Sequence, residues 1–460
     1  GGCHPRFQKH EYDILYRNIS FWSNEARLNW EGAWALIDKP ADAEVSIFRD
    51  QFLFQLRSPW NVAGKTWPSG ALVSAPIVDW MRGTRRTYPV YIPKEGGALV
   101  RFSFTKQSIL LNESMHVKNR IQVARLGEAG WTLEPLPMPL EGTVSAVGAN
   151  ELNDDSYWLS GSGFLNPYAL YRGDLVEGAS EKLKSNPAYF DADGYEVQQH
   201  FAVSGDGTRI PYFQVSRKGL VLDHSHPTLM AAYGGFEIPM LPRYSASVGA
   251  AGLVQGGVYV LANLRGGGEY GPVWHRAAIK ENKQKSYDDC AAIAEDLIAR
   301  GVTSATRLGI RGGSNGGLLV GNMMVQHPEL FGAMVCQVPL LDMQRFNKLL
   351  AGASWVGEYG DPDDPEQWKW LRRTSPYHQA KAGQPYPPVL FTTSTRDDRV
   401  HPGHARKMVA RLRAQGYDQM RYYENIEGGH GGAANNEQRA FVSALSYQFL
   451  WKTLSDTDEN

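Results

Sequence analysis

One segment constrains the fold of this chain more than any other, and it reads RLGIRGGSNGGLLVGNMM. An apolar strand ends near Ile310, and a helix is expected to begin directly after Ser314. The turn between them reads G-x-S-x-G, which between a strand and a helix is typical of a turn that lifts a nucleophilic serine above a sheet. Side chains two positions either side of the serine would collide, so glycine is required at Gly312 and Gly316. The helix that follows would direct N–H groups at a developing oxyanion.

Two further polar segments follow the serine in the chain order that such a site requires, which is Ser, then Asp or Glu, then His. Asp397 and Asp398 come after an apolar strand, at the end where carboxylates face a site. His430 lies between pairs of glycines, which suits a mobile loop that carries an imidazole to a serine hydroxyl. We predict that Ser314 is the nucleophile, that His430 is the base, and that one of the two carboxylates orients the imidazole. These residues alone do not decide between Asp397 and Asp398.

The residues around the serine alternate between strands and helices. Apolar runs without alternation are typical of parallel strands buried on both faces, and here they are separated by helical windows. Residues 191–460 are therefore expected to form a doubly wound, mostly parallel α/β domain of the α/β-hydrolase type, with an antiparallel hairpin at Ser204–Gly207. The expected strands lie at Thr228–Ala232, Val258–Ala262, Leu308–Ile310, Met334–Val338 and Val389–Phe391, and the expected helices at Tyr287–Arg300, after Ser314, at Gly403–Ala414 and at Asn436–Lys452.

Residues 1–190 follow a different pattern, of short β-type runs separated by turn residues. Three of these runs, at Phe52–Leu56, Ser108–Leu111 and Tyr157–Ser160, recur at intervals of about 50 residues, close to the ~40–50 of one four-stranded propeller blade. We expect an all-β partial β-propeller of about three to four blades, with a plain β-sandwich as the alternative. The polar stretch Gly173–Gly194 is expected to be the linker.

Composition excludes several classes of function. The net charge of −1 argues against a surface for nucleic acid or for an anionic membrane. No apolar run approaches the ~20 residues that span a bilayer, and the first residues do not have the layout of a secretory signal. Three cysteines are too few for a disulfide scaffold, which favours a reducing compartment. We expect a cytoplasmic location, with a periplasmic or secreted one left open if a longer N-terminus precedes this sequence.

Three motifs suggest cofactors and are set aside. Gly266–Gly271 matches G-x-G-x-x-G, but Asp288 and Asp289 open a helix rather than end a second strand, so no dinucleotide is expected. His401 and His404 are separated by proline and glycine and have no third metal ligand nearby. The acidic run at residues 361–366 lacks the ligand spacing of a calcium loop. We therefore expect no metal and no organic cofactor.

From about Gly194 to Leu454 the chain resembles the catalytic domain of prolyl oligopeptidases. The resemblance is carried, in order and spacing, by the segments AYGGF, NLRGGGEYG, GGSNGGLLV, GASWVGEYG, TRDDRV and EGGHG, and FLNPYALYRGDL resembles the end of that family's propeller. It implies a serine endopeptidase that cleaves short peptides after proline through an acyl-enzyme intermediate. It also implies that Asp397, the first aspartate of the DDR motif, is the triad acid.

The resemblance assigns further site residues. The hydroxyl of Tyr233 and the backbone N–H of Asn315 would bind the oxyanion, and Arg399 would bind a substrate carbonyl. A flat indole in the proline pocket would stack on the pyrrolidine ring of the substrate. The residues that match this pocket are Phe236, Leu340, Trp355, Tyr359 and Val400.

Two features depart from the family pattern. A complete propeller of the family has seven blades, so about 190 residues imply a truncated or a degenerate one. Glu358 lies beside the pocket and keeps open a preference for Arg or Lys, as in related oligopeptidases. An acylaminoacyl peptidase or an esterase of the same fold are further alternatives. A non-catalytic propeller scaffold is disfavoured because it would not need the three catalytic groups in order.

Overall fold

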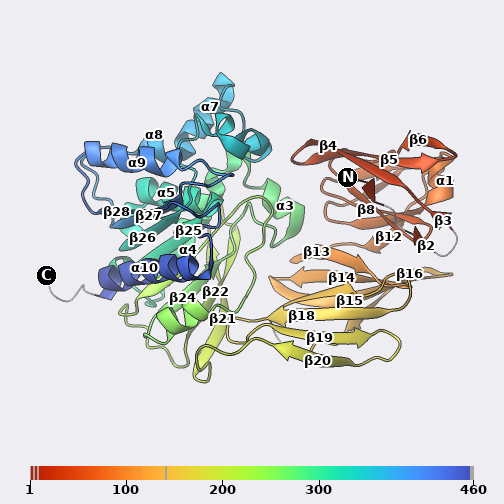
Figure 1. Cartoon of the computed structure of the whole chain (residues 1–460), viewed down its shortest axis with the longest axis horizontal. Helices are drawn as coiled ribbons and strands as arrows, with labels where there is room; N and C mark the ends of the chain where they lie inside the picture. Colours follow the sequence, from red (N-terminus) through yellow and green to blue (C-terminus); the bar gives the residue numbers. More distant parts are fainter. Residues whose placement is uncertain (1, 4–5, 8–9, 140–141, 456–460) are drawn as a thin grey trace. The chain divides into compact units, whose positions relative to one another are not determined.

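The computed structural model describes residues 2–3, 6–7, 10–139 and 142–455 (Figure 1). The chain divides into two compact units. The first contains the residues up to Pro187 together with Glu269–Val273, and the second contains Ala188–Gly268 and the residues from Trp274 onward. Among the described residues, no helix is both long and apolar enough to cross a membrane.

The described residues of the first unit form four antiparallel sheets of four strands each, with the orders β1-β4-β5-β6, β12-β11-β8-β7, β13-β14-β15-β16 and β17-β18-β19-β20. The strands are β1 Gly2–Cys3, β4 Ile14–Ser20, β5 Ser23–Trp30, β6 Ala33–Leu36, β7 Glu44–Phe48, β8 Gln51–Gln55, β11 Leu72–Pro76, β12 Tyr88–Tyr91, β13 Gly97–Phe104, β14 Ser108–Met115, β15 Lys118–Gly127, β16 Gly130–Leu136, β17 Thr143–Gly148, β18 Ser156–Ser162, β19 Ala169–Asp174 and β20 Ser180–Ser185. Two short hairpins (β2 Arg6–Phe7 with β3 His10–Glu11, β9 Trp60–Val62 with β10 Lys65–Trp67) and helix α1 Ile77–Met81 complete the unit.

Neighbouring sheets of this unit share apolar cores because side chains alternate between the two faces of a strand. In β14, Ile109 and Leu111 pack in a core with Phe48 and Leu53 of the preceding sheet. Leu110, between them, packs in a second core that includes Leu159 of the following sheet. The three recurring runs of the sequence lie in β8, β14 and β18, each an interior strand of its sheet. A strand covered on both faces buries apolar side chains on each of them, which explains these runs.

The stretch expected to be a linker is partly sheet. Gly173–Gly194 contains the end of β19 and all of β20, which pairs antiparallel with β19 at the edge of the fourth sheet. Its sequence, SEKLKS, is polar and mostly exposed. The prediction was wrong here because an edge strand that faces water carries no apolar signal.

The second unit is built on an eight-stranded sheet with the order β21-β22-β24-β23-β25-β26-β27-β28. β22 is antiparallel to both neighbours, and the strands from β24 to β28 are parallel. This is the doubly wound, mostly parallel sheet that the sequence predicts. The strands are β21 Tyr195–Val203, β22 Arg209–Arg217, β23 Thr228–Ala231, β24 Val258–Ala262, β25 Leu308–Gly313, β26 Ala333–Gln337, β27 Val389–Ser394 and β28 Met420–Asn425.

Helices cover both faces of this sheet (Figure 1). Met334 and Cys336 of β26 share a core with residues of α4 and α9, whereas Ala333 and Val335 pack against Leu450 of α10. The helices are α2 Ala246–Val248, α3 Gly271–Arg276, α4 Gln284–Ala299, α5 Asn315–Gln326, α6 Val356–Tyr359, α7 Pro365–Leu371, α8 Pro376–Gln379, α9 Gly403–Ala414 and α10 Asn436–Ser455. One π-helical turn (Gly249–Leu253) and six 3₁₀ segments (Lys280–Asn282, Ala305–Arg307, Pro328–Leu330, Phe346–Lys348, Leu350–Trp355, Arg372–Thr374) join them.

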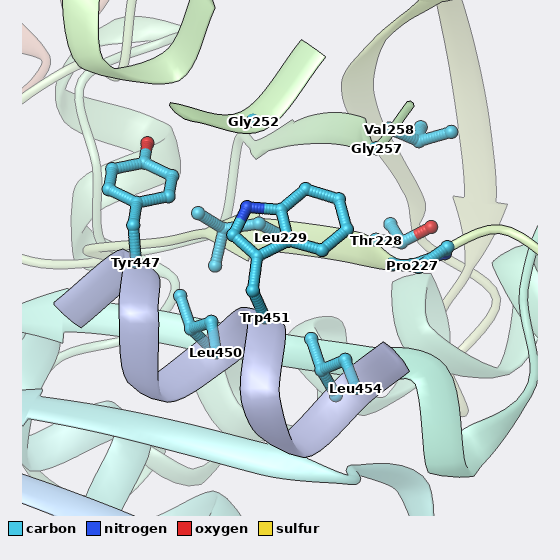
Figure 2. A pocket seen from close by; sticks show the side chains of 10 residues that line it. All are labelled: Pro227, Thr228, Leu229, Gly252, Gly257, Val258, Tyr447, Leu450, Trp451 and Leu454. Carbon is cyan, nitrogen blue, oxygen red and sulfur yellow. The ribbon is translucent and has the colours of Figure 1, made fainter. Parts of the chain in front are cut away.

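An apolar pocket lies between α10 and the start of strands β23 and β24, where Tyr447 and Trp451 of the helix flank Leu229 (Figure 2). The Trp451 indole N–H donates a hydrogen bond to the carbonyl of Ala251, which fixes the ring. The lining of this pocket contains none of the site residues that the sequence predicts. The pocket therefore belongs to the packing of α10 on the sheet.

Candidate active site

Ser314 lies at the turn between β25 and α5, with φ of 58° and ψ of −117°. A residue other than glycine rarely adopts a positive φ, so the turn is strained. The Ser314 N–H donates to the carbonyl of Gln337 at 2.9 Å, and its own carbonyl accepts the N–H of Gly317 at 2.9 Å. These bonds hold the serine at the carboxyl end of the parallel strands, where α/β sheets form their sites.

The two glycines of the turn are required by close backbone approach. A Cβ atom at Gly312 would lie 2.3 Å from the carbonyl oxygen of Gly316. A Cβ atom at Gly316 would lie 2.7 Å from the carbonyl oxygen of Ala232. The first distance is the collision across the serine that the sequence argument anticipates, and the second comes from the neighbouring strand.

His430 and Asp397 form a hydrogen-bonded pair, with 2.8 Å between Nδ1 and Oδ2. The Asp397 side chain is fully buried, and its Oδ1 accepts the backbone N–H groups of Arg399 and Val400, both at 2.9 Å. A carboxylate only accepts hydrogen bonds, so the imidazole carries its proton on Nδ1 and leaves Nε2 free to accept one. Asp398 is exposed. Of the two carboxylates left open by the residues, Asp397 is the one that the structure brings to the histidine.

The Tyr233 hydroxyl lies next to the serine. Burial and the nearby charge of Glu358 raise the pKa of Tyr233 to about 12, against the smaller opposing effects of Arg399 and of a hydrogen bond with Ser314. The phenol is therefore neutral at physiological pH and able to donate a hydrogen bond. Its backbone carbonyl accepts a bond from Nδ2 of Asn315 at 2.6 Å. Asn315 begins α5, whose first N–H groups have no partner within the helix.

An apolar cluster brings together the five residues that match the proline pocket of the family. Leu340, Trp355, Tyr359 and Val400 are buried in one cluster, and the half-buried Phe236 packs against it. Phe236 meets Tyr359 edge to face, with 5.5 Å between the ring centroids. The cluster also contains four buried residues that the sequence argument missed, which are Leu318, Met343, Phe346 and Leu371. No spacing signal marks them, because they come from separate segments, which are α5, the loop at residues 340–348 and α7.

Glu358 is not part of this apolar cluster. Its side chain is fully buried, and its carboxylate is bound by Lys283, by His275 and by the backbone N–H of Phe236. Burial alone would raise the pKa of Glu358, but Lys283 and the hydrogen bond from His275 outweigh burial and lower it to about 2. The expectation that Glu358 meets a basic substrate side chain is therefore unsupported, because its negative charge is already paired.

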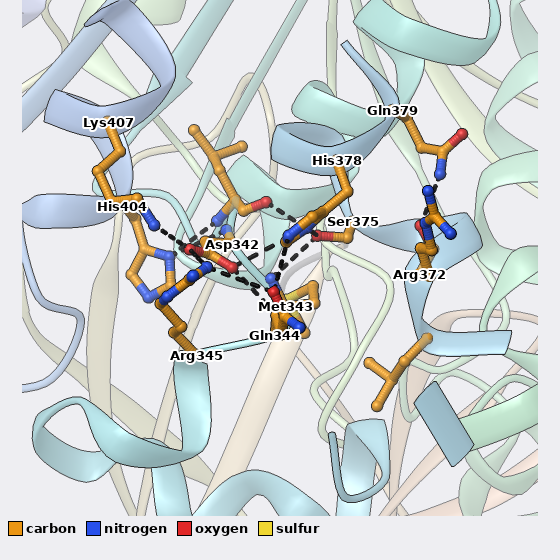
Figure 3. Close-up of polar contacts among 12 residues, drawn as sticks. Asp342, Met343, Gln344, Arg345, Arg372, Ser375, His378, Gln379, His404 and Lys407 are labelled. Atoms are coloured by element: carbon orange, nitrogen blue, oxygen red, sulfur yellow. Dashed lines mark hydrogen bonds and ion pairs between the residues drawn. The ribbon is translucent and has the colours of Figure 1, made fainter. Parts of the chain in front are cut away.

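The loop that carries Leu340 and Met343 is held from behind by a buried polar cluster (Figure 3). His404 Nδ1 accepts the backbone N–H groups of Leu341 at 3.2 Å and Asp342 at 3.1 Å. Burial lowers the pKa of His404 to about 4, so the ring is neutral and can accept these bonds. The Asp342 carboxylate is buried and paired with Lys407 of α9. His404, which the sequence argument considered only as a metal ligand, thus positions a pocket loop. Among the described residues, no group of three or more His, Cys, Asp or Glu side chains is arranged to hold a metal.

Comparison with known proteins is consistent with this geometry. Residues 245–457 match the model of the prolyl oligopeptidase family. The chain is 43% identical over 456 residues to the uncharacterized peptidase y4nA of Sinorhizobium fredii, covering 97% of this chain and 62% of that protein. It is 36% identical over 326 residues to the prolyl endopeptidase of Elizabethkingia miricola, covering 70% of this chain and 46% of the relative.

A solved structure of a post-proline cleaving enzyme from Rickettsia typhi superposes with a TM-score of 0.91 at 31% identity, covering 96% of this chain and 65% of that one. The chain therefore spans less than two thirds of the length of these relatives. Its sheets correspond to the β-propeller and the α/β-hydrolase domain of those proteins. The chain therefore contains a domain of the prolyl oligopeptidase family, at residues 245–457.

Proposed function

We propose that the protein is a serine peptidase that hydrolyses short peptides, preferentially after proline, through an acyl-enzyme intermediate. The observation that carries this proposal is the hydrogen-bonded pair of His430 and Asp397, which occurs in the same unit as the strained serine turn and a buried aromatic cluster. The names of the relatives, prolyl endopeptidase and post-proline cleaving enzyme, support the same substrate class.

The contacts support a definite role for each group. Ser314 Oγ attacks the carbonyl carbon of the substrate while His430 Nε2 takes its proton, and Asp397 stabilises the imidazolium that forms. The Tyr233 hydroxyl and the Asn315 N–H donate hydrogen bonds to the oxyanion. His430 then returns the proton to the leaving amine, and a water molecule hydrolyses the ester on Ser314 by the same steps. Every protein group that takes part in these reaction steps belongs to the chain itself, so we propose a reaction without metal or organic cofactor.

The pocket supports the preference for proline. The cluster is aromatic and aliphatic, and an indole such as that of Trp355 is suited to stacking on a pyrrolidine ring. Arg399 is exposed and its backbone is fixed on Asp397, so its guanidinium is available to a substrate carbonyl. The paired state of Glu358 favours proline over a basic residue at this position.

The partners that we propose are short peptides, with neither nucleic acid nor a membrane surface among them. The buried free thiols of Cys290 and Cys336 fit a reducing compartment, so we also propose a cytoplasmic location.

A fluorophosphonate probe tests the catalytic part of the proposal. The folded wild-type protein is expected to be labelled on Ser314, located by mass spectrometry of the digested protein, and the Ser314→Ala variant is expected to remain unlabelled. Absence of labelling in a folded sample would refute the enzyme assignment. Cleavage of an aryl ester but of no peptide would reduce the proposal to an esterase of the same fold.

A further inference from the structure

Three buried ionisable side chains behind the pocket have no part in the chemistry described so far. Glu358 and His275 are fully buried, and Lys283 has 3% of its side chain exposed. Burying charged groups is unfavourable unless they are paired and hydrogen-bonded, and here each has a partner. Pairing alone does not explain their position, because all three contacts converge on the segment that follows Tyr233.

Glu358 and Lys283 bind the backbone of this segment, residues 234–237, through hydrogen bonds. Lys283 Nζ donates to the carbonyl of Gly234 at 2.9 Å and to Glu358 Oε1 at 3.1 Å. The same carboxylate oxygen accepts the N–H of Phe236 at 3.0 Å. His275 Nε2 donates to the other oxygen, Oε2, at 2.6 Å, which leaves Oε1 to the lysine and the backbone.

The backbone of residues 234–237 is strained at two positions. Phe236 has φ of 55° and Glu237 has φ of 56°, values that residues other than glycine rarely adopt. Such strain persists only where the surroundings determine the conformation. The Glu358 carboxylate accepts its hydrogen bond from the N–H of Phe236, one of the two residues with positive φ. The ion pair is therefore placed to hold the strained turn that directly follows Tyr233.

A second connection runs from the same helix turn to the same tyrosine. The Tyr359 hydroxyl donates to Asn315 Oδ1 at 2.8 Å, and Asn315 Nδ2 donates to the carbonyl of Tyr233 at 2.6 Å. Glu358 and Tyr359 are neighbours in α6, and Trp355 directly precedes that helix. The helix turn that builds the proline pocket therefore holds the oxyanion segment at two separate points.

We propose that Glu358 and Lys283 are positioning residues that fix the Tyr233 hydroxyl for oxyanion binding and link it to the wall of the proline pocket. This inference rests on the proposed function. It assigns Glu358 to the alignment of the transition state and not to the recognition of a basic substrate. Loss of the pair is therefore expected to lower kcat with little change in KM.

A double-mutant cycle with Tyr233→Phe tests this directly, because a residue that acts through the tyrosine loses its effect once the hydroxyl is gone. We expect Glu358→Gln to lower kcat about 10- to 100-fold in the wild-type background, less than the roughly 10²- to 10³-fold loss on removing an oxyanion donor outright, because the hydroxyl is misplaced and not removed. In the Tyr233→Phe background the same change is expected to lower kcat no more than about twofold. Active sites are counted by fluorophosphonate titration, so that any unfolded fraction does not affect kcat.

Two further variants separate positioning from stability. Glu358→Gln combined with Lys283→Met removes both buried charges and is the form to use if the single variant does not fold; the same dependence on Tyr233 is expected. Asp289→Asn breaks another buried ion pair, between the fully buried Asp289 and Arg265, and is the matched control. It is expected to lower the melting temperature while kcat per active site stays within about twofold.

Equal losses of kcat in both Tyr233 backgrounds, no loss at all, or a loss confined to KM would overturn the inference. Each kcat is measured on a Gly-Pro chromogenic peptide and on a simple aryl ester. If the wild-type protein cleaves the ester but not the peptide, the proposed function fails, and the cycle on the ester still decides whether Glu358 acts through Tyr233.

Discussion

Asp397→Asn is the substitution whose consequence follows most directly from the contacts at the site. Asp397 Oδ1 accepts two backbone N–H groups, from Arg399 and Val400, both at 2.9 Å, while Oδ2 faces His430 Nδ1 at 2.8 Å. In asparagine, the single oxygen stays with the two N–H donors, because the amide nitrogen would leave both unpaired. The amide NH₂ then faces the imidazole and forces Nδ1 to accept.

That reversal places the imidazole proton on Nε2, so that Nε2 can no longer accept the proton of Ser314. Substitutions that impose this tautomer in serine peptidases lower kcat by about 10⁴-fold, and the same loss, about 5.4 kcal/mol in the activation barrier, is expected here. The assay is kcat on a Gly-Pro chromogenic peptide, with the rate of fluorophosphonate labelling of Ser314 as an independent readout of the nucleophile.

Asp398→Asn is the matched control, because it removes the same charge from the adjacent, exposed position. It is expected to change kcat by less than about threefold and to leave labelling intact, since surface charges have small effects. A folded Asp397→Asn variant with near-normal kcat, or a large loss from Asp398→Asn, would refute the reasoning.

Three further predictions concern the pocket, the turn and pH. Trp355→Ala is expected to reduce the ratio of kcat/KM for Gly-Pro over Gly-Ala peptides by about 10- to 100-fold, while Trp355→Phe retains most of it; equal ratios in all three proteins would contradict stacking. Gly316→Ala places a Cβ 2.7 Å from the carbonyl of Ala232 and is expected to abolish labelling of the serine, whereas at Gly313 the nearest atoms lie 3.7 Å away and alanine is expected to be tolerated. His404 is neutral in the folded protein with its pKa lowered to about 4, against 6.5 for the ordinary group. Because the unfolded chain binds the additional proton, the unfolding free energy is expected to fall by about 3 kcal/mol as pH drops from 7 to 4. The same comparison with His404→Asn, measured by urea denaturation, is expected to show a smaller fall, and an equal fall would contradict the assignment.

The sequence predicts the parts of this molecule that depend on local pattern. The serine turn, the parallel strands and the long helices each leave a periodic or glycine signal, and the predicted α9, Gly403–Ala414, has the bounds found in the structure. The start of α10 at Asn436 was also predicted, although its end at Ser455 lies beyond the expected Lys452.

What the sequence does not predict is where a side chain points when partners come from distant segments. Glu358 lies between Trp355 and Tyr359 in the chain, yet its carboxylate is bound by Lys283 and His275, at sequence separations of 75 and 83 residues. His404 shows no signal for its role either, since its partners are backbone N–H groups 62 and 63 residues away. Such contacts follow from the packing of α6 and α9 on the sheet, which pattern alone does not specify.

The measurement that tests the central claim most directly is the kcat/KM of the wild-type protein for chromogenic peptides ending in Gly-Pro, Gly-Ala and Gly-Arg, with Ser314→Ala as the blank. A preference for Gly-Pro of about a hundredfold or more, equivalent to about 2.7 kcal/mol of transition-state binding, is the result that the aromatic pocket and the paired Glu358 predict. A preference for Gly-Arg would contradict the account, because it would require a free carboxylate, and Glu358 is already bound by Lys283 and His275.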